Sequence, residues 1–253
     1  MKMQYLLSLV VFFVSAPLQA DDAAKDVVDR ALKARATRPE LLDKQKRQLI
    51  SMEGKIYNSG ELTASREMEC DWPSSVRWKT EFMSPNGRFV SVLALQDDEG
   101  WSTSGGAFAT EMLLKDVAEF KMELHGRWLA QLYPLRESGF ELTSMQDGRV
   151  GEEDVSVIKV TAKNRPDVMM SFSKKTNHLL KVSYKARESG IEMRKEHHFN
   201  DYKGFEGLML PEKLVDTKQV GSEPVSKVAE WKVTSYKFIE KFPDDHFAKP
   251  EKK

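Results

Sequence analysis

Only one cysteine occurs among the 253 residues, so the chain cannot form an internal disulfide. Cys70 follows Glu69 and has no neighbouring cation in the sequence, which does not favour a thiolate, so we expect an inert, half-buried cysteine on a strand. An excess of charge of one sign is also missing, because 39 basic residues balance 39 acidic ones. Without a positive field the chain is a poor candidate for binding nucleic acid. Its stability must come from a hydrophobic core.

Long apolar runs are scarce as well. The run Leu6–Val14 is too short to cross the ~30 Å hydrocarbon core as a permanent helix. Lys2 before it and Ala20 after it are typical of a secretory signal peptide, and we predict that residues 1–20 are removed by cleavage before Asp21. No cysteine comes directly after the run, which excludes the lipid-modified cysteine of a bacterial lipoprotein. We therefore expect residues 21–253 to be a single soluble, periplasmic domain without a lipid anchor.

Metal-binding and catalytic motifs are missing too. The sequence has no H-E-x-x-H, C-x-x-C or D-x-D-x-D-G pattern, and its adjacent His197 and His198 would point to opposite faces of a predicted strand. We expect the five histidines to be solvent-facing or hydrogen-bonded. The run Gly100–Gly105 misses the register of a G-x-S-x-G nucleophile turn. No nucleophile, base and orienting group can be proposed together, so we predict no catalytic residues, no metal and no cofactor.

Helical and strand periodicities divide what remains. Apolar residues at helical spacing, acids in the first turn and bases at the end predict a helix over Asp21–Ala36, stopped by Pro39. From Gln48 onward the period changes to 2, which predicts strands. The first five are expected at 48–56, 61–70, 76–82, 89–95 and around Trp101, with turns at 58–60 and 84–87. Neighbouring hairpins of this kind predict an antiparallel meander.

A second helical pattern interrupts the strands at Gly105–Tyr133, where Gly126 is a possible division into two helices. Seven further strands are predicted at 140–143, 155–162, 168–173, 179–185, 192–199, 208–217 and 225–239. A sheet of about 10 to 11 antiparallel strands with two separate amphipathic helices most simply curls around those helices. The predicted fold is therefore α+β, a strongly curved open half-barrel wrapped around an N-terminal helix and an inserted helical segment.

Four segments resemble a known family by their order along the chain. They are Trp72–Trp78, Asp98–Trp101, Phe199–Lys203 with Gly207 and Leu210-Pro211, and Ala229–Thr234 followed by Phe247–Pro250. The first is similar to a Pro-x-x-aromatic-x-Trp motif that begins a strand, and the third to an F-x-D-Y-K…G…L-P hairpin. On these segments the chain resembles the LolA/LolB-like superfamily of outer-membrane lipoprotein-sorting proteins, to which the regulatory domain of RseB is related.

The resemblance implies a curved sheet around helices that encloses an apolar cavity for acyl chains, without metal, cofactor or catalysis. Two departures stand out. Trp72 occupies the position where the carrier has an Arg that influences lipoprotein retention and release, and the chain is longer around Met112–Tyr133.

Flexible methionines and large apolar side chains on the predicted strands would suit such a cavity, although core packing is the alternative reading for each methionine alone. The helical face Leu113, Val117, Phe120 and Leu124 is predicted to form a lid. The candidate cavity-lining residues are Ile50, Met52, Ile56, Met68, Trp72, Trp78, Phe82, Val90, Leu113, Val117, Phe120, Met170 and Phe172.

Two functions remain open at this point. The first is a monomeric carrier that binds lipid acyl chains or lipoprotein cargo by reversible burial and meets transport components at the inner and outer membranes. The second is an RseB-like envelope sensor or scaffold domain, in which side chains fill the cavity and strand edges or loops bind a protein or peptide. A hydrolase is the least supported class because it lacks a catalytic constellation.

Overall fold

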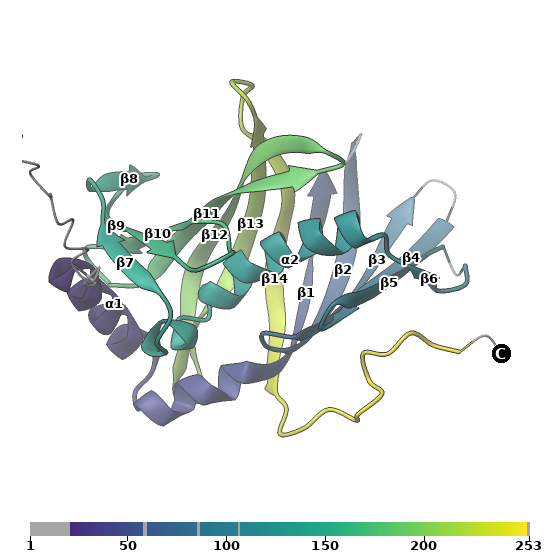
Figure 1. Cartoon of the computed structure of the whole chain (residues 1–253), viewed down its shortest axis with the longest axis horizontal. Helices are drawn as coiled ribbons and strands as arrows, with labels where there is room; N and C mark the ends of the chain where they lie inside the picture. Colours follow the sequence, from purple (N-terminus) through teal and green to yellow (C-terminus); the bar gives the residue numbers. More distant parts are fainter. Residues whose placement is uncertain (1–20, 58–59, 85–86, 106, 252–253) are drawn as a thin grey trace, which may run out of the picture.

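A computed structural model describes residues 21–57, 60–84, 87–105 and 107–251 (Figure 1). The predicted signal peptide, residues 1–20, lies outside the described residues, as do parts of the turns expected at 58–60 and 84–87. None of the helices in the described ranges is long and apolar enough to cross a membrane.

The N-terminal helix is confirmed as α1, Asp22–Arg35. Asp21 caps it, because its Oδ1 accepts a hydrogen bond of 3.0 Å from the Ala23 N–H and so satisfies one of the free donors of the first turn. A short 3-10 helix, η1 (Pro39–Lys46), follows and leads into the sheet. Sequence periodicity did not indicate η1, since a helix of this tighter kind lacks the 3.6-residue repeat.

The sheet is a single antiparallel one of 14 strands in the described residues. The first half contains β1 (Arg47–Tyr57), β2 (Glu61–Asp71), β3 (Ser75–Ser84), β4 (Gly87–Gln96), β5 (Glu99–Ser104) and β6 (Thr110–Glu111). The second half contains β7 (Glu141–Ser144), β8 (Gly148–Val150), β9 (Glu153–Thr161), β10 (Val168–Ser173), β11 (Leu179–Glu188), β12 (Ile191–Phe205), β13 (Leu208–Val220) and β14 (Ser226–Phe238). The α+β fold with a large open antiparallel sheet is confirmed, with more strands than expected because β6 and β8 are only two and three residues long.

Each half of the sheet is largely a meander, and the two halves meet in the middle. The strand order is β6-β5-β4-β3-β2-β1-β14-β13-β12-β11-β10-β9-β7, so the first strand pairs with the last. The β1–β14 pairing runs from Gln48 opposite Phe238 to Ile56 opposite Ala229, with one register shift. This pairing, the seam of the sheet, joins the two meanders, because β1 belongs to one and β14 to the other.

The inserted helix, α2 (Leu114–Leu129), crosses in front of the sheet (Figure 1). It runs without a break through Gly126, so the suggested division into two helices is wrong. The glycine serves close packing instead, since a Cβ at this position would lie 2.6 Å from the Tyr184 ring of β11. A second 3-10 helix, η2 (Tyr133–Arg136), ends the helical segment.

Two hydrophobic clusters fill the space between the helices and the sheet. One is centred on β1, β2, β3 and β14 and includes Trp78, Phe120 and Trp231. The other lies over β9 to β12 and includes Phe172 and, from the helices, Val28 and Leu129. Because α2 contributes side chains to both clusters, it joins the two halves of the molecule.

Candidate functional site

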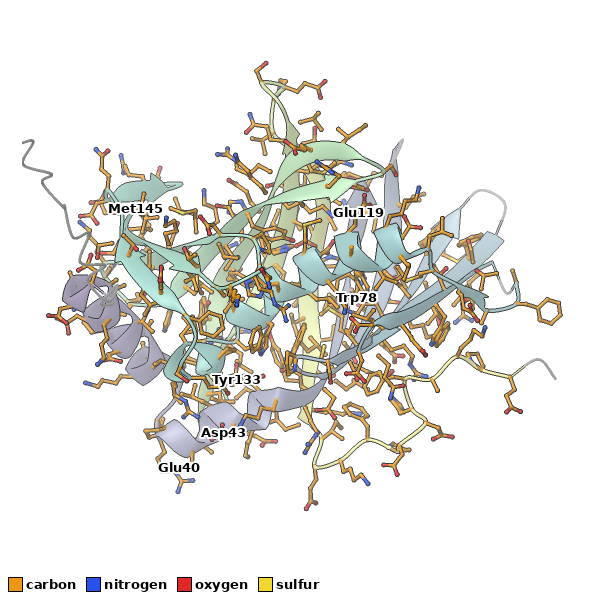
Figure 2. All side chains as sticks on the ribbon, viewed as in Figure 1. Glu40, Asp43, Trp78, Glu119, Tyr133 and Met145 are labelled. Carbon is orange, nitrogen blue, oxygen red and sulfur yellow. The ribbon has the colours of Figure 1, made fainter. Side chains whose placement is uncertain are left out.

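Most of the predicted lining residues lie inside the two clusters. Residues of the first cluster are Ile50, Met52, Met68, Trp72, Trp78, Val117 and Phe120, with Ile56 and Phe82 packed against it, and residues of the second are Met170 and Phe172. Leu124, also expected on the lid face, belongs to the first cluster. Figure 2 shows Trp78 between α2 and the strands, where its ring meets that of Phe120 edge-on with centroids 5.0 Å apart.

Two predicted lining residues lie elsewhere. Val90 pairs with Glu81 in the β3–β4 hairpin, one position away from the Phe82–Phe89 pair, so it faces the opposite side of the sheet from Phe82. A shift of one residue along a strand reverses the face, and the sequence pattern did not fix this register. Leu113 precedes α2 as its N-cap residue and is 62% exposed, so it is not part of the packed interior.

The interior leaves little free space. A cavity of about 50 Å³ remains between α2 and the sheet, lined by Ile50, Met68 and Trp72 among others. A pocket for a drug-sized ligand is typically 300–1,000 Å³, so a volume of this size holds a few water molecules and not an acyl chain. In this conformation the concave face of the sheet is filled by side chains.

A buried charged network occupies part of that face. Arg127 of α2 donates a 3.0 Å hydrogen bond to Asp216 of β13, and the other Asp216 oxygen lies 2.7 Å from His197 Nδ1 on β12. His197 Nε2 in turn lies 2.9 Å from the hydroxyl of Tyr184. Glu123, one turn before Arg127 on α2, pairs with Lys195 of β12 at 3.0 Å. We call these six side chains the buried network.

In the buried network, neighbouring charges lower the pKa of each acid by more than burial raises it. Burial alone would raise the pKa of Asp216, but the Arg127 charge and the hydrogen bond from His197 hold that pKa far below its usual range. Burial acts in the same direction on Glu123, and Lys195 and Arg127 lower the pKa of Glu123 to about 2. Both acids are therefore ionised at neutral pH, and α2 is tied to β12 and β13 by charge as well as by packing.

A third cation, Arg66 of β2, extends this polar region. Its guanidinium carbon lies 4.6 Å from the centroid of the Trp231 ring and 5.3 Å from that of Trp78, distances at which cation–π attraction contributes. Burial and then the neighbouring Arg127 charge lower the pKa of Arg66 to about 10. Sequence reasoning missed this region, because the buried network and Arg66 come from one helix and four strands and share no motif.

A cleft of about 790 Å³ lies beside α2, outside the packed interior. Its walls combine one side of the helix with the turns β2–β3, β4–β5 and β9–β10, so both meanders contribute. Its apolar wall consists of Pro73, Leu95, Met122, Leu124, Trp128 and Pro166. The cleft was not predicted, since only the curvature of the sheet brings Asp97 and Arg165, from turns far apart in the sequence, to the same cleft.

His125 of α2 also lines the cleft and departs from the expectation for histidines. It is 2% exposed, and neither ring nitrogen has a hydrogen-bond partner in the described part of the chain. Burial, and then the charge of Arg165, lower the pKa of His125 to about 4. Its imidazole is therefore neutral at pH 7, with one unused donor and one unused acceptor.

Other candidate chemistry gives no site. Cys70 is fully buried rather than half-buried, and burial raises the pKa of its thiol far above the usual range, which agrees with an inert cysteine. Over the ranges that the structure covers, no three His, Cys, Asp or Glu side chains are grouped closely enough to hold a metal ion.

No protein-family model matches the sequence, and no curated protein matches it. Solved structures do match, and together they define the class of fold. A LolA superfamily protein from Nitrosomonas europaea is 13% identical, with a TM-score of 0.53 over 89% of this chain and 97% of that one. A DUF1329 family protein from Desulfovibrio piger is 12% identical, with a TM-score of 0.51 over 88% of this chain and 96% of that one.

A third match is a domain from Vibrio parahaemolyticus described as an outer membrane lipoprotein-sorting protein, 15% identical, with a TM-score of 0.49 over 89% and 97% of the two chains. At these identities the two matches with TM-scores above 0.5 show the fold alone. The chain thus shares the curved-sheet fold of the LolA superfamily protein, and the resemblance expected from the four sequence segments is confirmed at the level of the fold.

Proposed function

We propose that this chain is a periplasmic, non-enzymatic carrier that binds acyl chains of a lipid or lipoprotein in the cleft beside α2. The observation that carries the proposal is the cleft itself, about 790 Å³ with an apolar wall on Met122, Leu124 and Trp128. That volume lies within the 300–1,000 Å³ range of ligand pockets. The fold shared with a LolA superfamily protein and the predicted signal peptide support an envelope role.

The proposal places the ligand differently from the sequence-based expectation. The interior residues Ile50, Met68 and Trp72 line only the 50 Å³ cavity, so in this conformation they stabilise the fold. They would contact an acyl chain only if α2 moved away from the sheet. Such a movement must break the Arg127–Asp216 and Glu123–Lys195 pairs, because both bridge α2 and the sheet. We therefore propose that the acyl chain of the ligand binds first in the cleft.

Filling the cleft tests this function. Ala118 lines the cleft from an exposed position on α2, so Ala118→Trp adds bulk there without removing a core contact. We expect this variant to bind a fluorescent fatty acid roughly tenfold more weakly than the wild type, which corresponds to ~1.4 kcal/mol. Native mass spectrometry after gentle purification should also show less co-purified lipid.

The matched control is Lys115→Trp, which places the same side chain at an exposed position of α2 outside the cleft. Its affinity should equal that of the wild type. If the wild type carries no lipid and takes up no fluorescent fatty acid, the carrier function is wrong. Equal affinities of both variants would instead remove the cleft from the proposal.

A scaffold that binds a protein partner is the second candidate, favoured by the filled interior and by exposed apolar side chains. Phe108 is 71% exposed and Leu114 is 85% exposed. Large exposed apolar side chains close together in the chain are typical of interaction surfaces. A stoichiometric partner from envelope extract that is lost in Phe108→Ser/Leu114→Ser but retained in Ala118→Trp would favour the scaffold. Bound lipid that is lost in Ala118→Trp but retained in Phe108→Ser/Leu114→Ser would favour the carrier.

A further inference from the structure

The polar residues of the cleft indicate the chemistry of the ligand's head group. His125 is almost fully buried in the wall, and both of its ring nitrogens lack a hydrogen-bond partner in the described residues. Buried polar atoms are nearly always hydrogen-bonded in folded proteins, because leaving them without a partner costs free energy. An unpaired histidine in the wall of a large cleft is therefore a donor that a ligand can use.

Arg165 supplies a positive charge at the same cleft. It lies in the turn between β9 and β10 and lines the cleft from an exposed position. No carboxylate of the described residues lies within ion-pair distance of its guanidinium, although other arginines, such as Arg127 and Arg149, form such pairs. Its charge also contributes to keeping the His125 imidazole neutral. A free guanidinium can bind both oxygens of a carboxylate or phosphate.

The remaining charges at the cleft restrict the charge of the head group. Lys121 of α2 is paired with Asp98, so these two charges cancel. Asp97, in the same turn as Asp98, is exposed and adds one negative charge. Arg165 neutralises a head group with one negative charge, whereas the second charge of a phosphate would have no cationic partner among the cleft residues and would be repelled by Asp97.

We infer that the cleft selects an amphiphile whose polar end is a carboxylate, held by the Arg165 guanidinium and a His125 N–H, with its chain along Leu95, Met122 and Trp128. This inference rests on the proposed acyl-binding function and names the class of its ligand. Binding requires the His125 ring to turn toward the cleft and make the hydrogen bond that it lacks in the free protein. A fatty acid fits this description, whereas a fatty alcohol offers no charge to Arg165.

The test compares amphiphiles that share one chain and differ in the head. Dissociation constants of the full chain for dodecanoate, dodecanol and dodecyl phosphate are measured by calorimetry at pH 7 and low salt. We expect dodecanoate to bind about tenfold more tightly than dodecanol, as for a hydrogen bond to a charged group that is partly exposed to water. Dodecyl phosphate, which carries more negative charge, should bind more weakly than dodecanoate.

Substitutions test which residues cause the preference for dodecanoate over dodecanol. Arg165→Gln should reduce the dodecanoate-to-dodecanol ratio to about one, because a neutral amide cannot attract the carboxylate. Lys163→Gln, in the same turn but outside the cleft, is the matched control and should keep the wild-type ratio. His125→Phe should weaken dodecanoate roughly threefold, and His125→Gln, which retains an N–H, should restore part of the loss.

Each outcome decides one statement. Equal binding of dodecanoate and dodecanol by the wild type overturns the carboxylate head and leaves the proposed function intact. If the wild type binds neither dodecanoate nor dodecanol, both the carboxylate head and the proposed carrier function are wrong. Tighter binding of dodecyl phosphate overturns the choice of carboxylate over phosphate. A wild-type preference that survives in Arg165→Gln and His125→Phe, with both variants melting cooperatively, overturns the assignment to these two residues.

Discussion

Some buried side chains on the concave face of the sheet are charged, although apolar side chains are expected there. Asp216 lies on the concave face of β13 and contacts both Arg127 and His197. A buried ion pair of this kind adds little compared with apolar packing, but the loss of one partner leaves the other charge buried without compensation. Asp216 is therefore the residue on which the stability of the buried network most depends.

Asp216→Asn tests this dependence. The amide keeps the shape of the side chain but removes the charge opposite Arg127, so we expect the free energy of unfolding to fall by about 3 kcal/mol. Urea denaturation monitored by tryptophan fluorescence measures the change. The control is Asp154→Asn, whose carboxylate pairs with Arg149 at the surface, and the expected loss there is under about 1 kcal/mol. Similar losses at both positions would contradict a special role for Asp216.

The contact between α2 and the sheet is the main relation between elements. Besides the ion pairs of the buried network, hydrogen bonds near one end of α2 and close packing near the other hold the helix against the sheet. Glu119, labelled in Figure 2, accepts hydrogen bonds from the Ser189 and Gly190 N–H groups of the β11–β12 turn, at 3.1 and 3.3 Å. Near the other end, Gly126 allows the helix to approach Tyr184 closely. A helix held in this way is fixed in position along the sheet as well as in distance from it.

Gly126→Ala measures how close this approach is. Alanine favours the helix by about 1 kcal/mol, but its Cβ would meet the Tyr184 ring at 2.6 Å, and overpacking typically costs about 1–3 kcal/mol. We expect net destabilisation, seen as a lower urea midpoint. Gly204→Ala is the matched control, because a Cβ there meets only Met209 Sδ at 3.8 Å. A more stable Gly126→Ala protein would show that α2 can move away from the sheet at little cost.

At the scale of the whole molecule, titration links the cleft and the buried network to acid stability. The pKa of His125 is lowered to about 4 in the folded protein from 6.5, so the unfolded chain binds more protons between these values and stability falls as pH decreases through this window. Glu123 and Glu196, both with a pKa lowered to about 2 from 4.5, stabilise the fold above pH 4.5 and lose that contribution between about 4.5 and 2.

We therefore expect the melting temperature to fall in two stages on acidification, first between pH 6.5 and 4 and then below 4.5. In His125→Phe the first stage should be smaller and the second unchanged. It should not vanish, because burial also lowers the pKa of His178 and His197. Calorimetric scans from pH 7 to 3 measure both stages, and identical curves for the two proteins would show that His125 is protonated as easily in the folded state as in the unfolded one.

The sequence predicted the elements better than their contacts. Period-2 alternation identified twelve of the strands, and the helical spacing with acids in the first turn and bases at the end identified α1, because both signals lie within single segments. The position of Val90 depended on a hairpin register that alternation alone does not determine. The buried network and the cleft join residues far apart in the chain, such as Arg127 with Asp216, and no local pattern encodes such a pair.

The seam between β1 and β14 has a kinetic consequence. Its strands lie at opposite ends of the described chain, and residues Gln48 and Phe238 must meet before it can form. Loop closure over such a separation is slow, and proteins dominated by distant pairings fold orders of magnitude more slowly than those with local contacts. Each meander can pair its own hairpins early, but the central pair of the sheet waits for the last strand. The core is therefore complete only after β14 has paired with β1, and until then the free edge of β1 is an unpaired strand edge that can aggregate.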